Sequence, residues 1–429
     1  MDSSGNSPHA DRHNFWVLAL HHIVLRVGWI FKTETVIMPG FLDALGVGGA
    51  VRGCLPVLNR IGQSVPQFLF ARRVRRMPRQ KWSLVAVSLG QGLPWLALSG
   101  IVWRWPQLSA GAHAAAFLVI YFVFNVTFGN WALLSGTIQG KLIAIDRRGR
   151  LLGVSNFWGC TLAAAAAALW LGRWLAHGLA GYSIIFAVTG GAFVLAGLLA
   201  SAFIEPAVEP SGADSGLAQF LRQAWRHVAA DRNFRRLIMV VALFHMVLIL
   251  FPHYIAYARI RLGAGSDCFV LWVVVQNLNN ACGSALVGPL SDRRGNRLAL
   301  SLLTTVAAAT PVVAIWLGHL PAPLADWGRP SFWLVFLLLG FTPITQRIIV
   351  NYALEIAPPT EHAIYLGTVQ LVQAFPLFFS PIFGWLIDAT SFELVFLTGS
   401  AMILAGGVIA HGLAEPRGTS IEVTPPTET

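Results

Sequence analysis

The sequence GPLSDRRGNR, from Gly288 to Arg297, joins two apolar stretches that contain no charged residue, 268–290 and 298–317. Each stretch is long enough to cross about 30 Å of hydrocarbon as a helix. Gly288 has no side chain and would let two helices approach closely at the membrane edge. Gly295 permits a tight reversal of the chain. The segment therefore predicts a short turn between two membrane-spanning helices.

The turn also carries the charges of this region. Asp292 can accept hydrogen bonds from the N-terminus of a neighbouring helix or pair with an arginine. Arg293, Arg294 and Arg297 hold the loop on the cytoplasmic side, because Lys and Arg concentrate in cytoplasmic loops. An ordinary positively charged loop that contains one aspartate is the alternative interpretation. The ten-residue pattern as a whole favours a specific role at the cytoplasmic helix ends.

The composition of the chain is that of a polytopic membrane protein. Of its 429 residues, 55% are apolar and only 11% are charged, about half the charged fraction of a soluble protein. Twelve apolar segments are long enough to span a membrane. We expect these spans at residues 15–36, 48–70, 83–103, 113–136, 151–171, 182–204, 236–257, 268–290, 298–317, 331–354, 363–387 and 393–413.

Basic residues decide the orientation and the domain organisation. The net charge of +11 would suggest a nucleic-acid partner in a soluble protein, but here most of the 30 Lys and Arg residues lie in loops on one side of the predicted spans. This asymmetry places both termini in the cytoplasm. We expect an N-terminal tail at 1–14, a six-helix half at 15–204, a linker at 205–235, a second six-helix half at 236–413 and a C-terminal tail at 414–429.

The linker contains a segment with helical periodicity. Leu217, Phe220, Leu221, Trp225 and Val228 fall on one helical face. We expect an amphipathic helix that lies on the inner leaflet with this face toward the lipid.

A degenerate copy of the charged turn lies in the first half. The sequence LNRIGQSVPQFLFARRVRRMPRQKW, residues 58–82, aligns with the second turn at an offset of 220 residues. Asn59 then stands opposite Asn279, and Arg72 stands opposite Asp292. Two half-copies at this spacing predict two related halves.

The motif GPLSDRRGNR resembles the cytoplasmic loop signature of the major facilitator superfamily, GxxxDRxGRR, with Asn296 where the family usually has a basic residue. RIIVNYALEIAPPTEHAIYLG, residues 347–367, resembles the family's R…E.xP…G region, and SPIFGWLID, residues 380–388, resembles its broken eleventh helix. The fifth span lacks the GP-rich motif of drug–proton antiporters. The resemblance implies an all-α integral membrane protein with twelve transmembrane helices in two pseudo-symmetric six-helix halves. It also implies transport by alternating access.

Polar and ionisable side chains inside the spans mark the candidate pathway, because such groups are expensive in lipid. The resemblance implies that the first, fourth, seventh and tenth spans line this pathway. The candidate cavity residues are His22, Arg26, Trp29, Asn125, His245, His253, Gln346 and Arg347. The two arginines favour an anionic ligand. In the alternative interpretation Arg26 pairs with a carboxylate or caps carbonyl groups, and the histidines contribute only to packing.

Glu34 is the candidate for coupling to a proton gradient. It is the one acidic residue that falls inside the first eleven predicted spans, and a membrane carboxylate can be protonated alternately from the two sides. A pair with Arg60 would instead make Glu34 a structural partner. We expect a secondary active transporter, symporter or antiporter, which is proton-coupled and carries a small organic anion or amphiphile.

The charged loops predict a cytoplasmic gate. From the resemblance we expect Asp292 to approach the helix that begins near Leu151, with Arg148 or Arg150 as partners. In the degenerate first loop, Arg72 or Arg73 should pair with Glu355 or Glu361 when the cytoplasmic side closes. In the alternative interpretation these charges are solvated separately. The expected gate residues are Gly288, Asp292, Arg293, Gly295, Arg297, Arg72, Arg73, Glu355 and Glu361.

Two other classes of protein remain as alternatives. A membrane-embedded enzyme acting on a lipid would need acid, base or nucleophile groups at one depth, but the twelve histidines are dispersed and no HExxH motif is present. A transport-inactive sensor or scaffold is favoured by the degenerate first loop. We expect no enzyme activity, cofactor, metal or nucleic-acid partner. We expect a monomer in the bacterial inner membrane whose partners are the lipid bilayer, a small-molecule substrate and protons.

Overall fold

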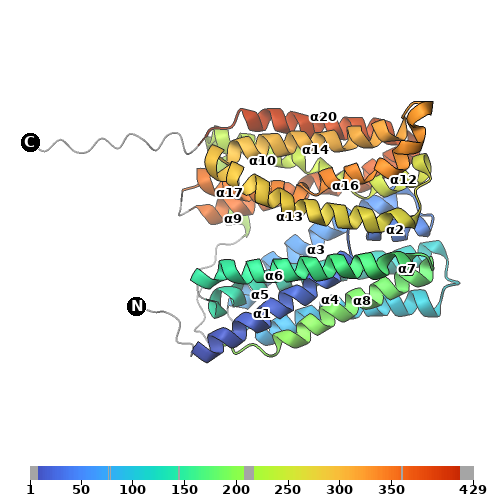
Figure 1. The fold of residues 1–429 in the computed structure, drawn as a ribbon. Coiled ribbons are helices and arrows are strands. Elements are labelled where there is room, and N and C mark those ends of the chain that lie inside the picture. Colours follow the sequence, from blue (N-terminus) through green and yellow to red (C-terminus); the bar gives the residue numbers. More distant parts are fainter. Residues whose placement is uncertain are drawn as a thin grey trace, which may run out of the picture. The chain divides into compact units, whose positions relative to one another are not determined.

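The computed structural model describes residues 8–75, 77, 79–143, 145–206, 217–358 and 361–415. Every regular element in this part of the chain is a helix (Figure 1), and the protein is an all-α integral membrane protein. Ten helical segments in the described ranges are long and apolar enough to cross a membrane. The first two predicted spans are not among them, because histidines and arginines interrupt α1 (Pro8–Ile30) and arginines, Asn and Gln interrupt α3 (Gly49–Arg75).

The chain divides into two compact units. The first consists of Met1–Asp214, Phe251–Val274 and Phe379–Ala389. Besides α1 and α3, its helices are α2 (Ile37–Ala44), α4 (Lys81–Arg104), α5 (Ala110–Leu142), α6 (Ile145–Ala166), a π-helical turn (Ala167–Leu171), α7 (Gly172–Leu175), α8 (Leu179–Ala200), α12 (His253–Leu262), a 3₁₀ turn (Ser266–Cys268) and α19 (Ser380–Ala389). Within this unit α4 packs along α8, α3 along α5, and α1 along both α6 and α8.

Aromatic side chains fill the centre of the first unit. Trp95 of α4 is fully buried. Its ring centroid lies 5.6 Å from that of Phe124 on α5 and 5.4 Å from that of Phe186 on α8. Large rings in van der Waals contact lock neighbouring helices in rotation as well as in distance. These contacts therefore fix which faces of α4, α5 and α8 are turned inward.

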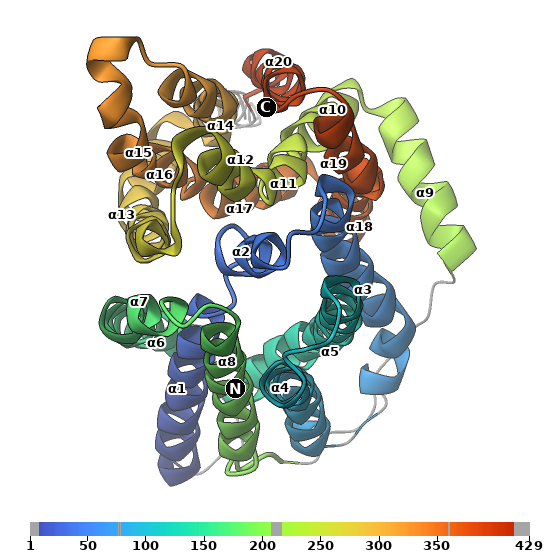
Figure 2. The ribbon, with the colours of Figure 1, turned by 90° about the vertical axis from the view of Figure 1, so that its right-hand side faces the viewer.

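The first unit also contains an unusually close crossing, between α3 and α19, which lie side by side in Figure 2. A Cβ atom added to Gly49 would collide with the backbone of Gly384, and the reverse substitution would collide with Gly49. Asp388 Oδ2 accepts a hydrogen bond from the Gly49 N–H at 2.6 Å. Small residues allow such backbone proximity between helices in a membrane.

The second unit consists of Ser215–Leu250, Val275–Phe378 and Thr390–Thr429. Its helices are α9 (Leu217–Ala230), α10 (Arg232–Phe244), α11 (Met246–Leu250), most of α13 (Phe269–Arg294), α14 (Asn296–Gly318), a 3₁₀ turn (Ala322–Trp327), α15 (Gly328–Ser331), α16 (Trp333–Leu339), α17 (Thr342–Ile356), α18 (His362–Ala374), a 3₁₀ turn (Phe375–Phe379) and α20 (Phe392–His411). Here α20 packs along α14 and α10.

Prolines lie at helix breaks within or just after predicted spans. In the first predicted span, 15–36, the helix ends at Ile30, and α2 starts after a break at Ile37. Pro39 lies in the first turn of α2, where its missing N–H costs nothing, whereas its ring would clash with a helix continuing from upstream. The seventh predicted span, 236–257, is likewise three helices, with Pro252 directly before α12.

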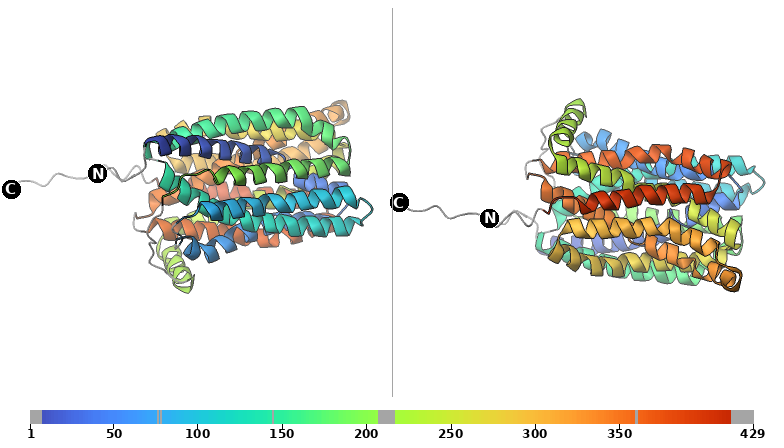
Figure 3. Two further views of the ribbon diagram at one scale, coloured as in Figure 1. Left: turned by 90° about the horizontal axis from the view of Figure 1, so that it is seen from below. Right: turned by 90° about the horizontal axis from the view of Figure 1, so that it is seen from above.

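The amphipathic helix of the linker is present as α9, but its predicted face is divided. Figure 3 shows α9 running at a steep angle to α20. Phe220 lies against Gly367 of α18, and His227 lies 3.6 Å from a carboxylate oxygen of Glu361. By contrast Leu221 and Trp225 are exposed, Trp225 by 72%. The expectation that this whole apolar face turns toward the lipid is therefore wrong, because Phe220 packs on α18.

Candidate functional site

The break between α1 and α2 places two opposite charges beside helix ends. Lys32 follows the end of α1, and its backbone N–H donates to the Trp29 carbonyl at 3.0 Å. Glu34 precedes the start of α2. The C-terminal end of a helix carries partial negative charge and the N-terminal end partial positive charge, so each side chain lies near an end of opposite sign. Lys32 Nζ and Glu34 Oε1 form an ion pair of 2.7 Å.

The ammonium group of Lys32 is enclosed by protein. The side chain is fully buried, and Nζ lies 4.0 Å from the ring centroid of Trp29, 4.3 Å from that of Phe124 and 5.5 Å from that of Tyr121. Aromatic faces attract cations. Three rings and one carboxylate thus stabilise the positive charge.

The carboxylate of Glu34 is anchored from α3. Asn59 Nδ2 lies 2.8 and 2.9 Å from the two oxygens of Glu34 and 3.2 Å from Asn125 Oδ1. Gln63 Nε2 donates to Asn59 Oδ1 at 3.0 Å and lies 3.2 Å from Asn125 Oδ1. An amide NH₂ has two hydrogens, so Asn59 can satisfy only some of these acceptors at once. We call Lys32, Glu34, Asn59, Gln63, Tyr121 and Asn125 the Glu34 cluster.

The two charges of the cluster differ in access. Lys32 has no exposed side-chain surface, whereas the Glu34 side chain is 32% exposed. The carboxylate is therefore open to its surroundings on one side, whereas the cation that neutralises it is enclosed.

Two further candidates on α1 pack against neighbouring helices. The ring centroid of Trp29 lies 5.7 Å from that of Phe124, 4.9 Å from Phe128 and 6.1 Å from Phe193. The aliphatic stem of Arg26 lies beside Gly159 of α6. No carboxylate pairs with Arg26 among the described residues. The predicted structural pairing of Arg26 is therefore not observed in that part of the chain.

Histidines on α1 show why the sequence alone could not choose between adjacent positions. His22 was the predicted cavity residue and is half-buried. The neighbouring His21 is fully buried, and its Nδ1 lies 2.8 Å from the Ala196 carbonyl oxygen. Its Nε2 accepts a hydrogen bond from the Trp131 indole at 3.3 Å. His21 thus links α1 to α8 and α5 and has a structural role.

His253 belongs to the first unit, on α12. It is fully buried, and neither ring nitrogen has a hydrogen-bond partner in the described part of the chain. The positively charged guanidinium of Arg52, on α3, is an electrostatic neighbour of the His253 ring. Arg52 itself pairs with Asp43 at 2.6 Å and lies 3.8 Å from Asp388. The guanidinium therefore ties α3 to the segments before it and to α19.

The second unit contains the candidates His245, Gln346 and Arg347. His245 is buried at the end of α10, with Nδ1 2.6 Å from the Val241 carbonyl oxygen. On α17, Gln346 is half-buried and Arg347 is exposed. No ion pair of Arg347 is present within the described ranges. Arg347 is therefore available to a ligand or to solvent.

The charged turn has the predicted backbone but different contacts. Gly295 has a φ of +85°, which confirms the tight reversal, and Glu415 fills the space beside it. A Cβ on Gly288 would meet no atom within 4 Å, so the close helix approach expected there is wrong. Arg297 Nε lies 3.6 Å from Glu415 Oε2, a pair that the sequence analysis missed, and Arg293 is exposed.

The remaining gate predictions are open. The side chains of Arg72, Arg73, Asp292 and Arg148 lie outside the described residues. Glu361 has His227 as a neighbour, as given above, and Glu355 is half-buried on α17. The proposed pairing of these glutamates with the first loop stays a prediction.

The sequence analysis did not select four members of the Glu34 cluster as candidates: Lys32, Asn59, Gln63 and Tyr121. Lys32 was recognisable from Trp29 three residues before it and Glu34 two residues after it, a spacing that brings an aromatic ring and a carboxylate to the same helix end. Asn59 was noted only as part of the repeat. Among the described residues, no three His, Cys, Asp or Glu side chains lie close enough together to hold a metal ion.

An all-α membrane protein whose helices form two units has the architecture common among polytopic solute transporters. The family model described as "Major Facilitator Superfamily" matches residues 27–381. The chain belongs to this family, and it is a secondary transporter. No curated protein matches its sequence.

Solved structures share the fold at low sequence identity. A mutant of the nucleoside transporter NupG is similar with a TM-score of 0.73 and 11% identity, over 94% of this chain and 100% of that one. A D-xylose–proton symporter is similar with a TM-score of 0.64 and 14% identity, over 94% and 99% of the two chains. A POT family transporter in complex with 5-aminolevulinic acid gives a TM-score of 0.68 and 12% identity, over 94% and 96%.

Proposed function

We propose that the protein is a proton-coupled transporter of a small organic anion, with Glu34 as the proton carrier. The observation that carries the proposal is the ion pair between a partly exposed Glu34 and a fully buried Lys32 at the break in the first span. Discontinuous helices at the membrane midplane are common sites of coupling in secondary transporters.

The coupling follows from the bonds of the Glu34 cluster. Ionised Glu34 neutralises Lys32 and accepts hydrogen bonds from Asn59. Protonation removes the negative charge and converts one acceptor oxygen into a donor. Lys32 then loses its counter-ion, and Asn59 is released toward Asn125. Protonation therefore changes the free energy of the α1–α2 break relative to α3 and α5, which is the differential interaction that a conformational switch requires.

The anionic class of the solute rests on the two arginines. Arg26 and Arg347 have no ion pair among the described residues. A guanidinium is always charged and binds carboxylates and phosphates with two parallel hydrogen bonds. An arginine in a membrane span without a carboxylate partner favours a ligand that supplies the negative charge.

The test is proton flux in proteoliposomes loaded with the pH dye pyranine. Lactate, succinate and glucose 6-phosphate are added in turn, with and without an imposed pH gradient. At least one anion should move protons through the wild-type protein. Glu34→Gln should abolish this flux but keep exchange of the labelled anion across the membrane, because exchange needs no net proton movement.

The matched control is Glu393→Gln, at the start of α20, where the carboxylate faces His319 at 3.5 Å. This variant should retain proton flux. Wild-type flux in Glu34→Gln would show that Glu34 is not the proton carrier. Absence of movement of every anion through the wild-type protein, with neutral sugars moving instead, would show that the solute class is wrong.

A further inference from the structure

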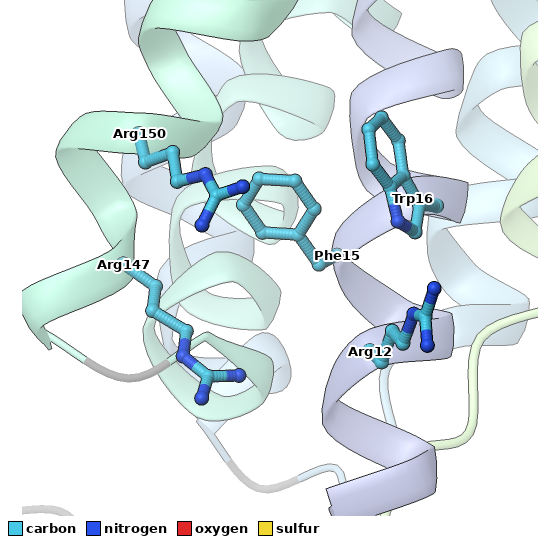
Figure 4. Close-up of a pocket in the computed structure, with 5 residues that line it drawn as sticks. All are labelled: Arg12, Phe15, Trp16, Arg147 and Arg150. Atoms are coloured by element: carbon cyan, nitrogen blue, oxygen red, sulfur yellow. The ribbon is translucent and has the colours of Figure 1, made fainter.

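Three arginines gather around a pocket at one end of the first unit, separate from the Glu34 cluster. The pocket has a volume of about 490 Å³ and is lined by Arg12, Phe15, Trp16, Arg147 and Arg150. Arg147 and Arg150 extend from α6 toward α1, whereas Arg12 lies along α1 beside Trp16 (Figure 4). The helices α1 and α6 pack against each other, so both sides of the pocket belong to one packed pair of helices.

The positive charge of the pocket is not neutralised by the residues that the structure describes. None of the three arginines has an ion pair with a carboxylate there. The Arg150 guanidinium lies 6.0 Å from the Phe15 ring centroid, a contact that leaves its N–H groups free. Arg147 and Arg150 also lie in the first two turns of α6, where the helix dipole adds positive potential. The pocket is thus built for an anion.

C-terminal to the arginines, the exposed side chains of α1 and α6 become apolar. Arg12, Trp16 and Leu20 are four residues apart on α1, and all three are exposed, Trp16 by 54% and Leu20 by 47%. At 1.5 Å per residue this stripe runs about 12 Å along the helix. On α6 the exposed side chains likewise change from Arg150 to Phe157, which is 64% exposed.

We infer that this pocket binds an anionic phospholipid from the membrane. The phosphate group contacts the three arginines, the glycerol region lies beside Trp16, and an acyl chain follows Leu20 and Phe157. Tryptophan prefers this interfacial depth, and basic pockets between transmembrane helices on the cytoplasmic side are suited to anionic headgroups. A zwitterionic lipid would bring an additional cation to a cluster that already has three, and a free anion would use the arginines but not the apolar stripe.

Native mass spectrometry of the full-length protein tests this inference. The detergent-solubilised protein is titrated with dioleoyl phosphatidylglycerol and, separately, with dioleoyl phosphatidylcholine of the same acyl chains. We expect retained phosphatidylglycerol and weaker phosphatidylcholine binding. Each of Arg12→Gln, Arg147→Gln and Arg150→Gln should weaken the phosphatidylglycerol adduct by about fivefold, since a basic residue near a lipid surface contributes about 1 kcal/mol. The triple variant should weaken it by about 100-fold.

The matched control is Arg104→Gln. Arg104 is an exposed arginine at the end of α4, next to the exposed Trp103 and Trp105, and it does not line the pocket. This variant should leave the phosphatidylglycerol adduct unchanged. A second variant, Leu20→Ser, keeps all three arginines and should weaken the adduct only through its acyl chain.

The outcomes separate lipid from a soluble anion. Excess inorganic phosphate should displace little phosphatidylglycerol, because phosphate cannot replace the acyl contacts. Equal retention of the two lipids, or an unchanged adduct in the triple variant, would overturn the inference. So would full displacement by inorganic phosphate together with an unchanged adduct in Leu20→Ser, because the pocket would then bind the anion alone.

Discussion

Removing either charge of the Lys32–Glu34 pair should have unequal effects on stability. Glu34→Gln leaves the ammonium group of Lys32 without a counter-ion, and this group is fully buried. Lys32→Met leaves Glu34, which is 32% exposed and keeps its hydrogen bonds from Asn59. We therefore expect Glu34→Gln to be the more destabilising change. We also expect the double variant Lys32→Met/Glu34→Gln to recover most of the loss, because it contains neither charge.

The magnitudes follow from the surroundings of each group. An unpaired buried charge costs about 3–5 kcal/mol. The rings of Trp29 and Phe124, at 4.0 and 4.3 Å from Lys32 Nζ, still stabilise the cation, and such an interaction contributes up to about 2 kcal/mol when desolvated. Glu34→Gln should therefore cost about 2–3 kcal/mol, and Lys32→Met about 1 kcal/mol. With a double variant within about 1 kcal/mol of the parent, the coupling energy is about 2–3 kcal/mol.

The assay is SDS-induced unfolding, followed by the fluorescence of the 16 tryptophans for the parent, both single variants and the double variant. Glu415→Gln serves as control, because its pair with Arg297 is longer, at 3.6 Å, and partly exposed. Such a pair contributes about 0–1 kcal/mol. Additive losses in the double variant, or a larger loss in Lys32→Met than in Glu34→Gln, would refute the account of a buried cation held by Glu34.

Three other predictions concern transport of the anion identified in proteoliposomes. Asp292→Asn should lower the initial transport rate several-fold while protein abundance, measured by immunoblot, stays near the parental level; an unchanged rate would remove Asp292 from the gate. Arg26→Gln should raise KM for the anion about tenfold or more, since a charged hydrogen bond contributes about 1.5–3 kcal/mol, and an unchanged KM would rule out contact with the solute. Gly49→Val should reduce transport strongly, because the valine side chain would meet the backbone of Gly384. The control Gly100→Val should transport at the parental rate, because a Cβ there meets no atom within 4 Å. Equal transport rates in the two variants would contradict a close crossing of α3 and α19.

The sequence by itself determined the class of protein and the reversal of its charged turn. These features are local: the apolar runs report on the solvent around a helix, and Gly295 was recognised as the residue that permits a positive φ, which the structure shows at +85°. The broken eleventh span was expected from the resemblance of residues 380–388 to the family's eleventh helix, and it is divided into α18, a 3₁₀ turn and α19. Pro252 stands directly before the start of α12, although the predicted seventh span ran through it, whereas Pro39 lies in α2, beyond the predicted end of the first span.

Only the tertiary structure decided which polar side chains meet. Glu34 and Asn59 lie 25 residues apart, and Gly49 and Asp388 lie 339 apart. Helices that are apolar on nearly every side give no periodic signal of which face is inward, so the rotation of each helix depends on packing by residues such as Trp95. The same rotation places Phe15 beside Arg150 of α6, and it determines that His21 rather than His22 is buried. The partners of a side chain depend on how different helices pack together. No single segment of the sequence contains this information.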